Sequence, residues 1–160
     1  MIKFTPHTRA DIPLRIKWLN DRNTTLHAIS NPENDTTEEL QNKWFDDYEE
    51  KLAHGEKKFF TIFSDETPIG FMGLSNINTE TKDAKIFILI GEDEYRGKGI
   101  GNQSVSFLIN YAFNDLHLNA LNLDVNKLNI PAINLYKNLG FKETGEDGEN
   151  KEFWLMRLEK

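Results

Sequence analysis

The 160-residue sequence contains no cysteine and no long apolar run. Without thiols, the chain can form neither a disulfide bond nor a thiolate metal site nor a cysteine acyl-enzyme. No stretch approaches the roughly 20 apolar residues that a membrane-spanning helix needs. Residues 1–6 also lack the apolar core of a secretory signal peptide. We therefore expect a cytoplasmic protein with no membrane partner and no covalent thiol chemistry.

The sequence also has fewer positively charged than negatively charged residues. The chain has 19 Lys and Arg residues against 26 Asp and Glu residues, which gives a formal net charge of -7. A negatively charged protein repels the phosphate backbone, so we expect no nucleic-acid partner. The histidines have neither the spacing of metal ligands nor a serine partner, so we expect no metal and assign them no role. They are His7, His27, His54 and His117.

The remaining composition, 38% hydrophobic and 28% charged, is that of an ordinary globular domain, and the length suits one domain over residues 1–160. Alternating and helical spacings of apolar residues predict the elements. We expect strands over 2–5, 59–63, 69–76, 84–90, 121–125, from 141 onward and over 153–158. We expect helices from about 11 to 20, 37 to 53, 105 to 116 and 130 to 139. This order indicates a mixed α+β fold and not the repeated βαβ units of a dinucleotide-binding domain.

A glycine-rich stretch, residues 91–101, joins the apolar run 86–90 to the clearest helix of the chain. The first amides of a helix lack intrahelical partners and carry the positive end of the helix dipole. A glycine loop at that point can therefore close its amides around a phosphate group. Arg96 and Lys98 add positive charge to the same loop.

Two familiar phosphate motifs fit this stretch poorly. It is not a P-loop, because five residues instead of four separate Gly91 from Gly97, and Lys98 is followed by another glycine. A dinucleotide fingerprint is a weak alternative, because Ser104 occupies the position of its third glycine. Only Asp124, at the end of the next predicted strand, supports it.

Residues 96–101, Arg-Gly-Lys-Gly-Ile-Gly, resemble the acetyl-CoA pyrophosphate loop of the GNAT superfamily of N-acetyltransferases, Arg/Gln-x-x-Gly-x-Gly/Ala. The predicted order of strands and helices also matches that superfamily. Residues 18–21 and 111–113 are similar to its ribosomal-protein and spermidine N-acetyltransferase branches. A second segment matches the cofactor-binding and catalytic motif of the superfamily at every signature position: Asn129-x-x-Ala132-x-x-Leu135-Tyr136-x-x-x-Gly140-Phe141.

The resemblance implies a GNAT-like twisted, mostly antiparallel sheet of about seven strands flanked by four helices. It implies acetyl-CoA as cosubstrate, with its pyrophosphate on the amides of 96–101 and its pantetheine arm paired like an extra strand with the backbone of 89–91. The cofactor-binding residues implied are Leu89, Ile90, Gly91, Arg96, Gly97, Lys98, Gly99, Ile100, Gly101, Asn102, Asn129 and Tyr136. Many members have Val-x-Pro where this chain has Gly91-Glu92-Asp93, so we expect Gly91 to leave a cofactor-facing position without a side chain.

The implied reaction is direct transfer of acetyl from the CoA thioester to an amine. The resemblance assigns Tyr136 as the general acid that protonates the leaving thiolate. An alkylamine has a pKa of about 10, so some base must remove a proton before the amine can attack. The candidate bases are Asp83, Glu92, Asp93 and Asp124.

The acceptor amine should bind at the first two predicted helices and the loop between them. We assign Glu33, Asp35 and Asp124 to it, because an acidic site attracts a polycation such as spermidine. We expect an acetyl-CoA-dependent N-acetyltransferase that acts on a primary amine of a small molecule and, as is frequent in the family, forms a homodimer. Two alternatives stay open: an N-terminal acetyltransferase of the ribosomal-protein type with a peptide amine as acceptor, and a non-catalytic CoA-binding module.

Overall fold

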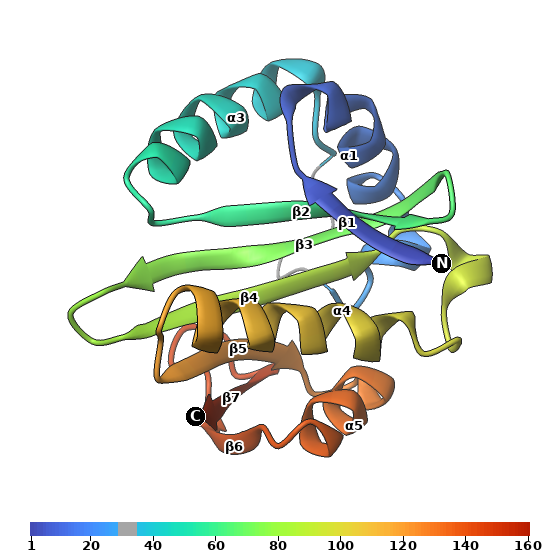
Figure 1. Cartoon of the computed structure of the whole chain (residues 1–160). Coiled ribbons are helices and arrows are strands. Elements are labelled where there is room, and N and C mark those ends of the chain that lie inside the picture. The colour runs from blue at the N-terminus through green and yellow to red at the C-terminus, as the bar shows by residue number, and fades with distance from the viewer. Residues whose placement is uncertain (29–34) are drawn as a thin grey trace.

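The computed structural model describes residues 1–28 and 35–160 and arranges them around one seven-stranded sheet (Figure 1). The strands lie in the order β1-β2-β3-β4-β5-β7-β6. Their bounds are β1 (Ile2–Pro6), β2 (Lys58–Ser64), β3 (Thr67–Asn78), β4 (Asp83–Ile90), β5 (Ala120–Asn126), β6 (Lys142–Glu146) and β7 (Phe153–Glu159). The helices of the described residues are α1 (Ile12–Leu19), α2 (Arg22–Thr25), α3 (Glu38–Ala53), α4 (Ile100–Asn110), which runs on into a π-helical turn (Tyr111–Asp115), and α5 (Ile130–Asn138). The expected mixed α+β fold with seven strands is confirmed.

Neighbouring strands are antiparallel except β4 and β5, which run parallel. Their pairing is short, because it joins only residues 83–85 of β4 to residues 120–122 of β5. Beyond Lys85 the two strands continue without pairing, as far as Ile90 and Asn126. The sheet therefore opens between β4 and β5, at the end where the glycine-rich stretch leaves β4.

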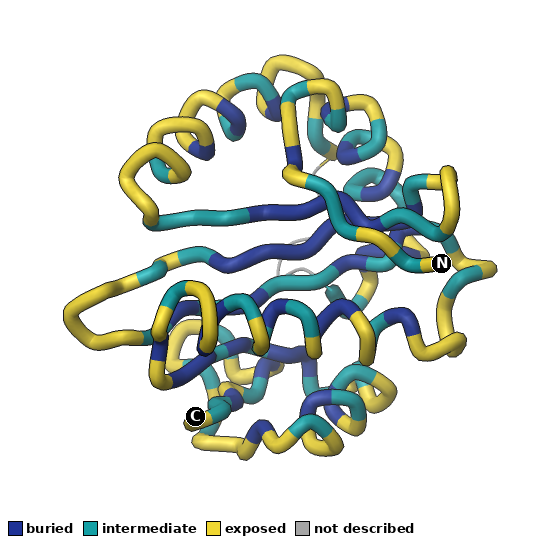
Figure 2. Tube along the Cα trace, in the orientation of Figure 1, coloured by how far each residue is buried: buried dark blue, intermediate teal, exposed yellow. Residues whose placement is uncertain are grey.

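Helices cover both faces of the sheet, with α1 and α3 on one face and α4 and α5 on the other (Figure 1). The buried residues lie along the central strands and on the helix sides that face them (Figure 2). Strand β4 serves both layers, because its side chains alternate between the faces. Phe87 and Leu89 belong to the aromatic cluster under α1 and α3, whereas Ile86 and Ile88 pack with the core on the α4 side.

The sequence predicted four helices, and the described residues form five, because α2 was missed. This single turn begins at Asp21, whose carboxylate accepts a hydrogen bond from the backbone amide of Asn23 at 3.0 Å. Helix α3 begins at Thr37, whose hydroxyl accepts from the amide of Leu40 at 3.2 Å. None of the described helices is both long and apolar enough to cross a lipid bilayer.

Candidate active site

A cleft of about 560 Å³ lies where β4 and β5 separate. Four segments supply its described walls. They are residues 23–28 around α2, the unpaired half of β4 (86–90), the loop and helix start at 95–102, and the stretch 124–136 from β5 into α5. The unpaired length of the sheet thus brings together the two motifs that the sequence singled out.

The loop between β4 and α4 presents a row of free backbone donors. Gly97 and Gly99 have φ angles of 72° and 79°, which are left-handed conformations that favour glycine. Gly99 is the N-cap of α4 and supplies no side chain to its amides. Within the described residues, no protein atom accepts a hydrogen bond from the six consecutive amides of 97–102, and the first bond into the helix runs from Gln103 to Gly99 at 3.2 Å. Such a row of amides at a helix N-terminus is an anion-binding site.

The glycines of this loop are required by the backbone conformation. A Cβ added at Gly97 or Gly99 would meet nothing within 4 Å, so both glycines serve the backbone conformation and not the packing. Gly101 and Asn102 also line the cleft, whereas Ile100 is buried in the core. Lys98 is exposed, with its ammonium 5.6 Å from the centre of the Tyr95 ring, and does not line the cleft.

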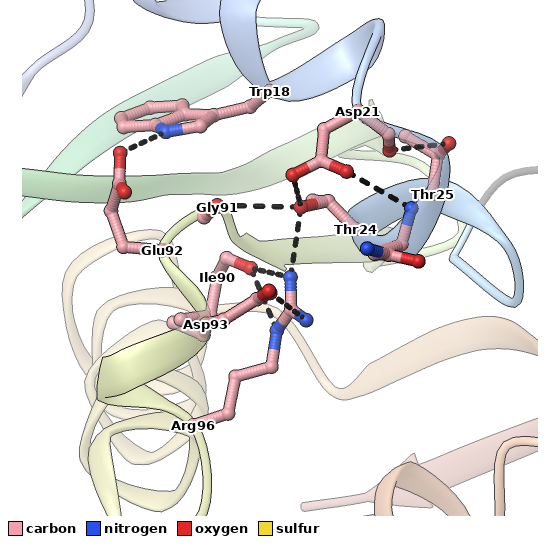
Figure 3. Close-up of polar contacts among 10 residues, drawn as sticks. Trp18, Asp21, Thr24, Thr25, Ile90, Gly91, Glu92, Asp93 and Arg96 are labelled. Atoms are coloured by element: carbon pink, nitrogen blue, oxygen red, sulfur yellow. Dashed lines mark hydrogen bonds and ion pairs between the residues drawn. The ribbon is translucent and has the colours of Figure 1, made fainter.

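The guanidinium of Arg96 points toward Ile90 and Thr24 (Figure 3). Its guanidinium donates to the carbonyl of Ile90 at 2.9 Å and to the hydroxyl of Thr24 at 2.9 Å, and it pairs with Asp93 at 2.5 Å. From the sequence we expected the charge of Arg96 to lie beside the phosphate loop. In the structure the guanidinium joins the loop to β4 and α2 through its hydrogen bonds to Ile90 and Thr24.

The backbone groups of β4 that face the cleft are not all those of residues 89–91, to which we expected the pantetheine arm to pair. The amide of Gly91 donates to the carbonyl of Ile69 on β3 at 2.7 Å, so Gly91 faces β3. Because backbone groups alternate along a strand, Leu89 faces β3 as well, and Ile88 and Ile90 face the cleft. A ligand that pairs with β4 would therefore use Ile88 and the amide of Ile90, whose carbonyl already accepts from Arg96, and not Leu89 and Gly91.

Gly91 has a packing role that sequence reasoning missed. A Cβ at this position would lie 2.3 Å from the indole ring of Trp18, so the space that we expected to face the cofactor is filled by α1. The Trp18 indole nitrogen donates to the carboxylate of Glu92 at 2.8 Å, which fixes the ring over the glycine (Figure 3). Gly91 thus allows α1 to lie close to the end of β4.

Tyr136 lies on α5, is 7% exposed, and lines the cleft. Its ring packs against Phe141 at a centroid distance of 5.6 Å. Its hydroxyl makes no hydrogen bond to any residue that the structure describes. Burial, with the nearby charge of Asp124 as a smaller cause, raises the pKa of Tyr136 well above its usual value. The phenol therefore keeps its proton at neutral pH, as a general acid must. Asn129 caps this helix, with its carboxamide oxygen accepting from the amide of Ala132 at 3.3 Å.

Of the four candidate bases, Asp124 alone lines the cleft. It forms an ion pair with Lys85, and its side chain is 19% exposed. Asp83 accepts instead from Asn122 and Arg157 at 3.2 and 3.3 Å, where β4 and β5 are still paired. Hydrogen bonds from Lys17 and Trp18 lower the pKa of Glu92, and Asp93 is paired with Arg96.

The two other residues assigned to the acceptor are not placed in the cleft. Asp35 pairs with Arg22 at 2.8 Å outside the cleft lining, and Glu33 lies outside the described residues. The wall on that side comes from Asn23, Thr24, His27 and Ala28, which lie in the segment between the first two predicted helices where we expected the acceptor, although these residues were not singled out. The polar run that begins at the helix cap Asp21 was the available signal for this wall.

Comparisons with known proteins agree with this geometry. The family model for the acetyltransferase (GNAT) domain matches residues 2–142. The spermidine N(1)-acetyltransferase of Vibrio cholerae is 30% identical over 139 residues, covering 86% of this chain and 76% of that protein. The enzyme of the same name from Escherichia coli K12 is 32% identical over 99 residues, 62% of this chain, and the match spans about half of that protein (53%). The acetyltransferase PseH of Campylobacter jejuni is 29% identical over 162 residues, 97% of this chain and 90% of that protein.

A similar fold is found among solved structures. The crystal structure of spermidine N-acetyltransferase from Vibrio cholerae in complex with CoA and spermine has a TM-score of 0.84 at 22% identity, covering 99% of this chain and 95% of that one. At this identity the likeness concerns the fold. Because the family model extends over nearly the whole chain, with both motifs in place around one cleft, the protein belongs to the acetyltransferase (GNAT) domain family.

Proposed function

We propose that this protein transfers an acetyl group from acetyl-CoA to a primary amine of a small molecule. One observation carries the proposal: the row of unpartnered amides at the start of α4, with Gly97, Gly99, Gly101 and Asn102 in the cleft lining, and the buried phenol of Tyr136 meet at the same cleft. The amides suit a phosphate-bearing substrate, and the phenol suits a departing thiolate. Membership in the family supports acetyl-CoA as that substrate.

The protein would bind the cosubstrate mainly through hydrogen bonds from its backbone groups. The amides of 97–102 would bind its pyrophosphate, and Ile88 and Ile90 would pair with its pantetheine arm. Asn102 and Asn129 also line the cleft and would offer it polar side chains. Three of the residues assigned from the sequence place no side chain in the cleft. Gly91 would contribute by its packing under Trp18, and Lys98 and Ile100 would contribute through their backbone amides.

Acetyl-CoA supplies the activated acyl group, and the protein supplies proton control. Tyr136 would donate its proton to the sulfur as the thiolate leaves. Asp124 would hold the ammonium of the acceptor and receive its proton, directly or through water, and Lys85 is the internal cation that balances Asp124 until the acceptor arrives. On β5, Asp124 alternates with Leu123 and Val125, which pack in the core on the α4 side, so its side chain lies on the same face of the sheet as Phe87 and Leu89. The acceptor would therefore approach from the side of α1 and α2.

For the acceptor we propose a polyamine first. The relatives from Vibrio cholerae and Escherichia coli are named spermidine N(1)-acetyltransferases, and Asp124 provides a carboxylate in the cleft. A peptide amine is the second candidate acceptor. We also propose a homodimer in the cytoplasm. A Vibrio cholerae structure is described as dodecameric, and light scattering will give the subunit number for this chain.

The test is release of free CoA from acetyl-CoA, followed with a thiol reagent. The absence of cysteine keeps the protein background at zero. The acceptor panel holds spermidine, spermine, an aminoglycoside, an amino-sugar nucleotide and a ribosomal N-terminal peptide. We expect turnover with the polyamines. Turnover with the peptide alone would replace the proposed acceptor class, and CoA binding by calorimetry without any turnover would support the non-catalytic alternative.

A further inference from the structure

The Arg96 side chain contacts both sides of the cleft (Figure 3). Its backbone begins the phosphate loop, and its guanidinium donates to the Ile90 carbonyl from Nε at 3.2 Å and from Nη2 at 2.9 Å. The same Nη2 donates to the hydroxyl oxygen of Thr24 at 2.9 Å. One arginine therefore ties the cofactor loop to α2, on the opposite wall.

The hydroxyl of Thr24 is held in place for this contact. Thr24 is 6% exposed, and its hydroxyl donates to the carboxylate of Asp21 at 3.0 Å, with the carbonyl of Gly91 also in reach at 3.3 Å. The hydrogen bond from Thr24, together with amide hydrogen bonds and the charge of Arg96, lowers the pKa of Asp21. Asp21 therefore stays ionised and keeps the Thr24 oxygen free to accept from Arg96.

Helix α2 also positions the acceptor wall. Asn23 and Thr24 lie in the helix, His27 and Ala28 follow it, and all of them line the cleft. A shift of α2 moves this wall as a unit, because Asp21 fixes the helix start and the chain leaves the helix directly into the wall. The hydrogen bond between Arg96 and Thr24 therefore helps to determine the distance between the acceptor wall and the phosphate loop.

We propose that Arg96 is a positioning residue that couples the two substrate sites, so that occupation of the loop amides by CoA tightens the binding of the amine. This inference rests on the proposed function. An anion on the amides of 97–102 orders the backbone from which Arg96 extends, and Arg96 in turn orders α2 through Thr24. Coupling between binding sites is reciprocal, so the amine also tightens the binding of CoA by the same factor.

Thr24→Val tests the coupling, because valine keeps the shape of threonine and loses the hydroxyl. We expect the KM for spermidine to rise about tenfold, the loss of one hydrogen bond to a charged group. The affinity for CoA alone, measured by calorimetry, should stay within about twofold. The factor by which spermidine tightens the binding of CoA should fall to about 1. Thr24→Ser keeps the hydroxyl and should restore both the KM and the coupling.

Thr25→Val is the matched control. Thr25 is fully buried in the same helical turn, and its hydroxyl donates to the Asp21 carbonyl at 3.0 Å without contacting Arg96. An equal loss of coupling in Thr25→Val, or unchanged coupling in a folded Thr24→Val, would overturn the inference. Failure of the unmodified protein to bind CoA would instead remove the proposed function, and the coupling with it. Melting curves of each variant separate these outcomes from unfolding.

Discussion

Tyr136 is a phenol that its surroundings keep protonated and leave without a hydrogen-bond acceptor among the described residues. A buried tyrosine usually finds a partner for its hydroxyl. Here the hydroxyl faces the cleft where the sheet opens, so the missing partner is one that a substrate can provide. The edge-to-face contact with Phe141 fixes the ring without using the oxygen.

Tyr136→Phe removes this proton and little else. We expect kcat to fall about a hundredfold, at the lower end of what general acids contribute. The affinity for CoA should change less than about twofold, because the ring and its packing remain. Steady-state kinetics and calorimetry measure the two quantities. Tyr111→Phe, a half-buried phenol that packs on Phe60 and Phe107, is the control and should leave kcat unchanged. Equal turnover in Tyr136→Phe would remove the assigned role.

At the scale of single residues, the sequence could predict the site residues that belong to short local motifs. The glycine loop and Tyr136 stand within short motifs, and the structure brings them to one cleft. The contact of Arg96 with Thr24 and the close approach of Gly91 to Trp18 could not be predicted, because the residues of each pair lie more than 70 positions apart in the chain. No local pattern records a hydrogen bond or a close approach across that separation.

Helix α3 shows the same limit at the scale of an element. Leu40, Trp44, Tyr48 and Leu52 are spaced four residues apart, which predicts one apolar stripe with Phe45 alongside. Leu40 and Leu52 are nevertheless 50% and 37% exposed. The buried face instead contains Gln41, Phe45 and Tyr48. Gln41 is buried because its carboxamide oxygen accepts from Arg15 at 2.6 Å and its amide nitrogen donates to Thr36 at 2.8 Å. Hydrophobic periodicity cannot recognise a polar residue that is buried for its hydrogen bonds.

The docking of α1 on β4 gives a prediction for Gly91→Ala. The added methyl group would overlap the Trp18 indole at 2.3 Å. Overpacking of this kind costs about 1–3 kcal/mol, so the free energy of unfolding should fall by that amount in urea denaturation. Gly148→Ala is the control, because a Cβ there meets nothing within 4 Å. A Gly91→Ala variant as stable as the control would contradict the proposed packing role.

At the scale of the whole molecule, a buried polar cluster next to β1, α1 and β2 should make the stability of the fold depend on pH. His7 is 3% exposed, and its Nε2 lies 3.2 Å from the guanidinium of Arg15, which can only donate. Nε2 must therefore accept, and the single proton of the ring sits on Nδ1, 2.7 Å from the hydroxyl of Thr61. The carboxylate of Asp11 lies 3.4 Å from Nδ1 of the ring. Burial, aided by the charge of Arg15, lowers the pKa of His7 to about 3.

This histidine predicts a pH dependence of stability. The unfolded chain binds a proton at His7 below its ordinary pKa of about 6.5, and the folded protein does not bind it until about pH 3. Stability should therefore fall as the pH drops through that window, by up to about 1.4 kcal/mol per pH unit from this group. Urea denaturation of the unmodified protein and of His7→Gln measures it, since other acidic groups contribute to both. Parallel pH curves for the two proteins would contradict the prediction.

The parallel pairing that stops at Lys85 has a further consequence for the molecule as a β-sheet. It leaves two strand edges inside the fold, each with backbone groups that no neighbouring strand satisfies. Free edges are templates for pairing with another chain. A ligand that pairs with Ile88 and Ile90 would act as the missing strand, so that occupying the cleft and completing the sheet become one event. Without such a ligand the sheet would keep its gap between β4 and β5, and a bound pantetheine arm would close it.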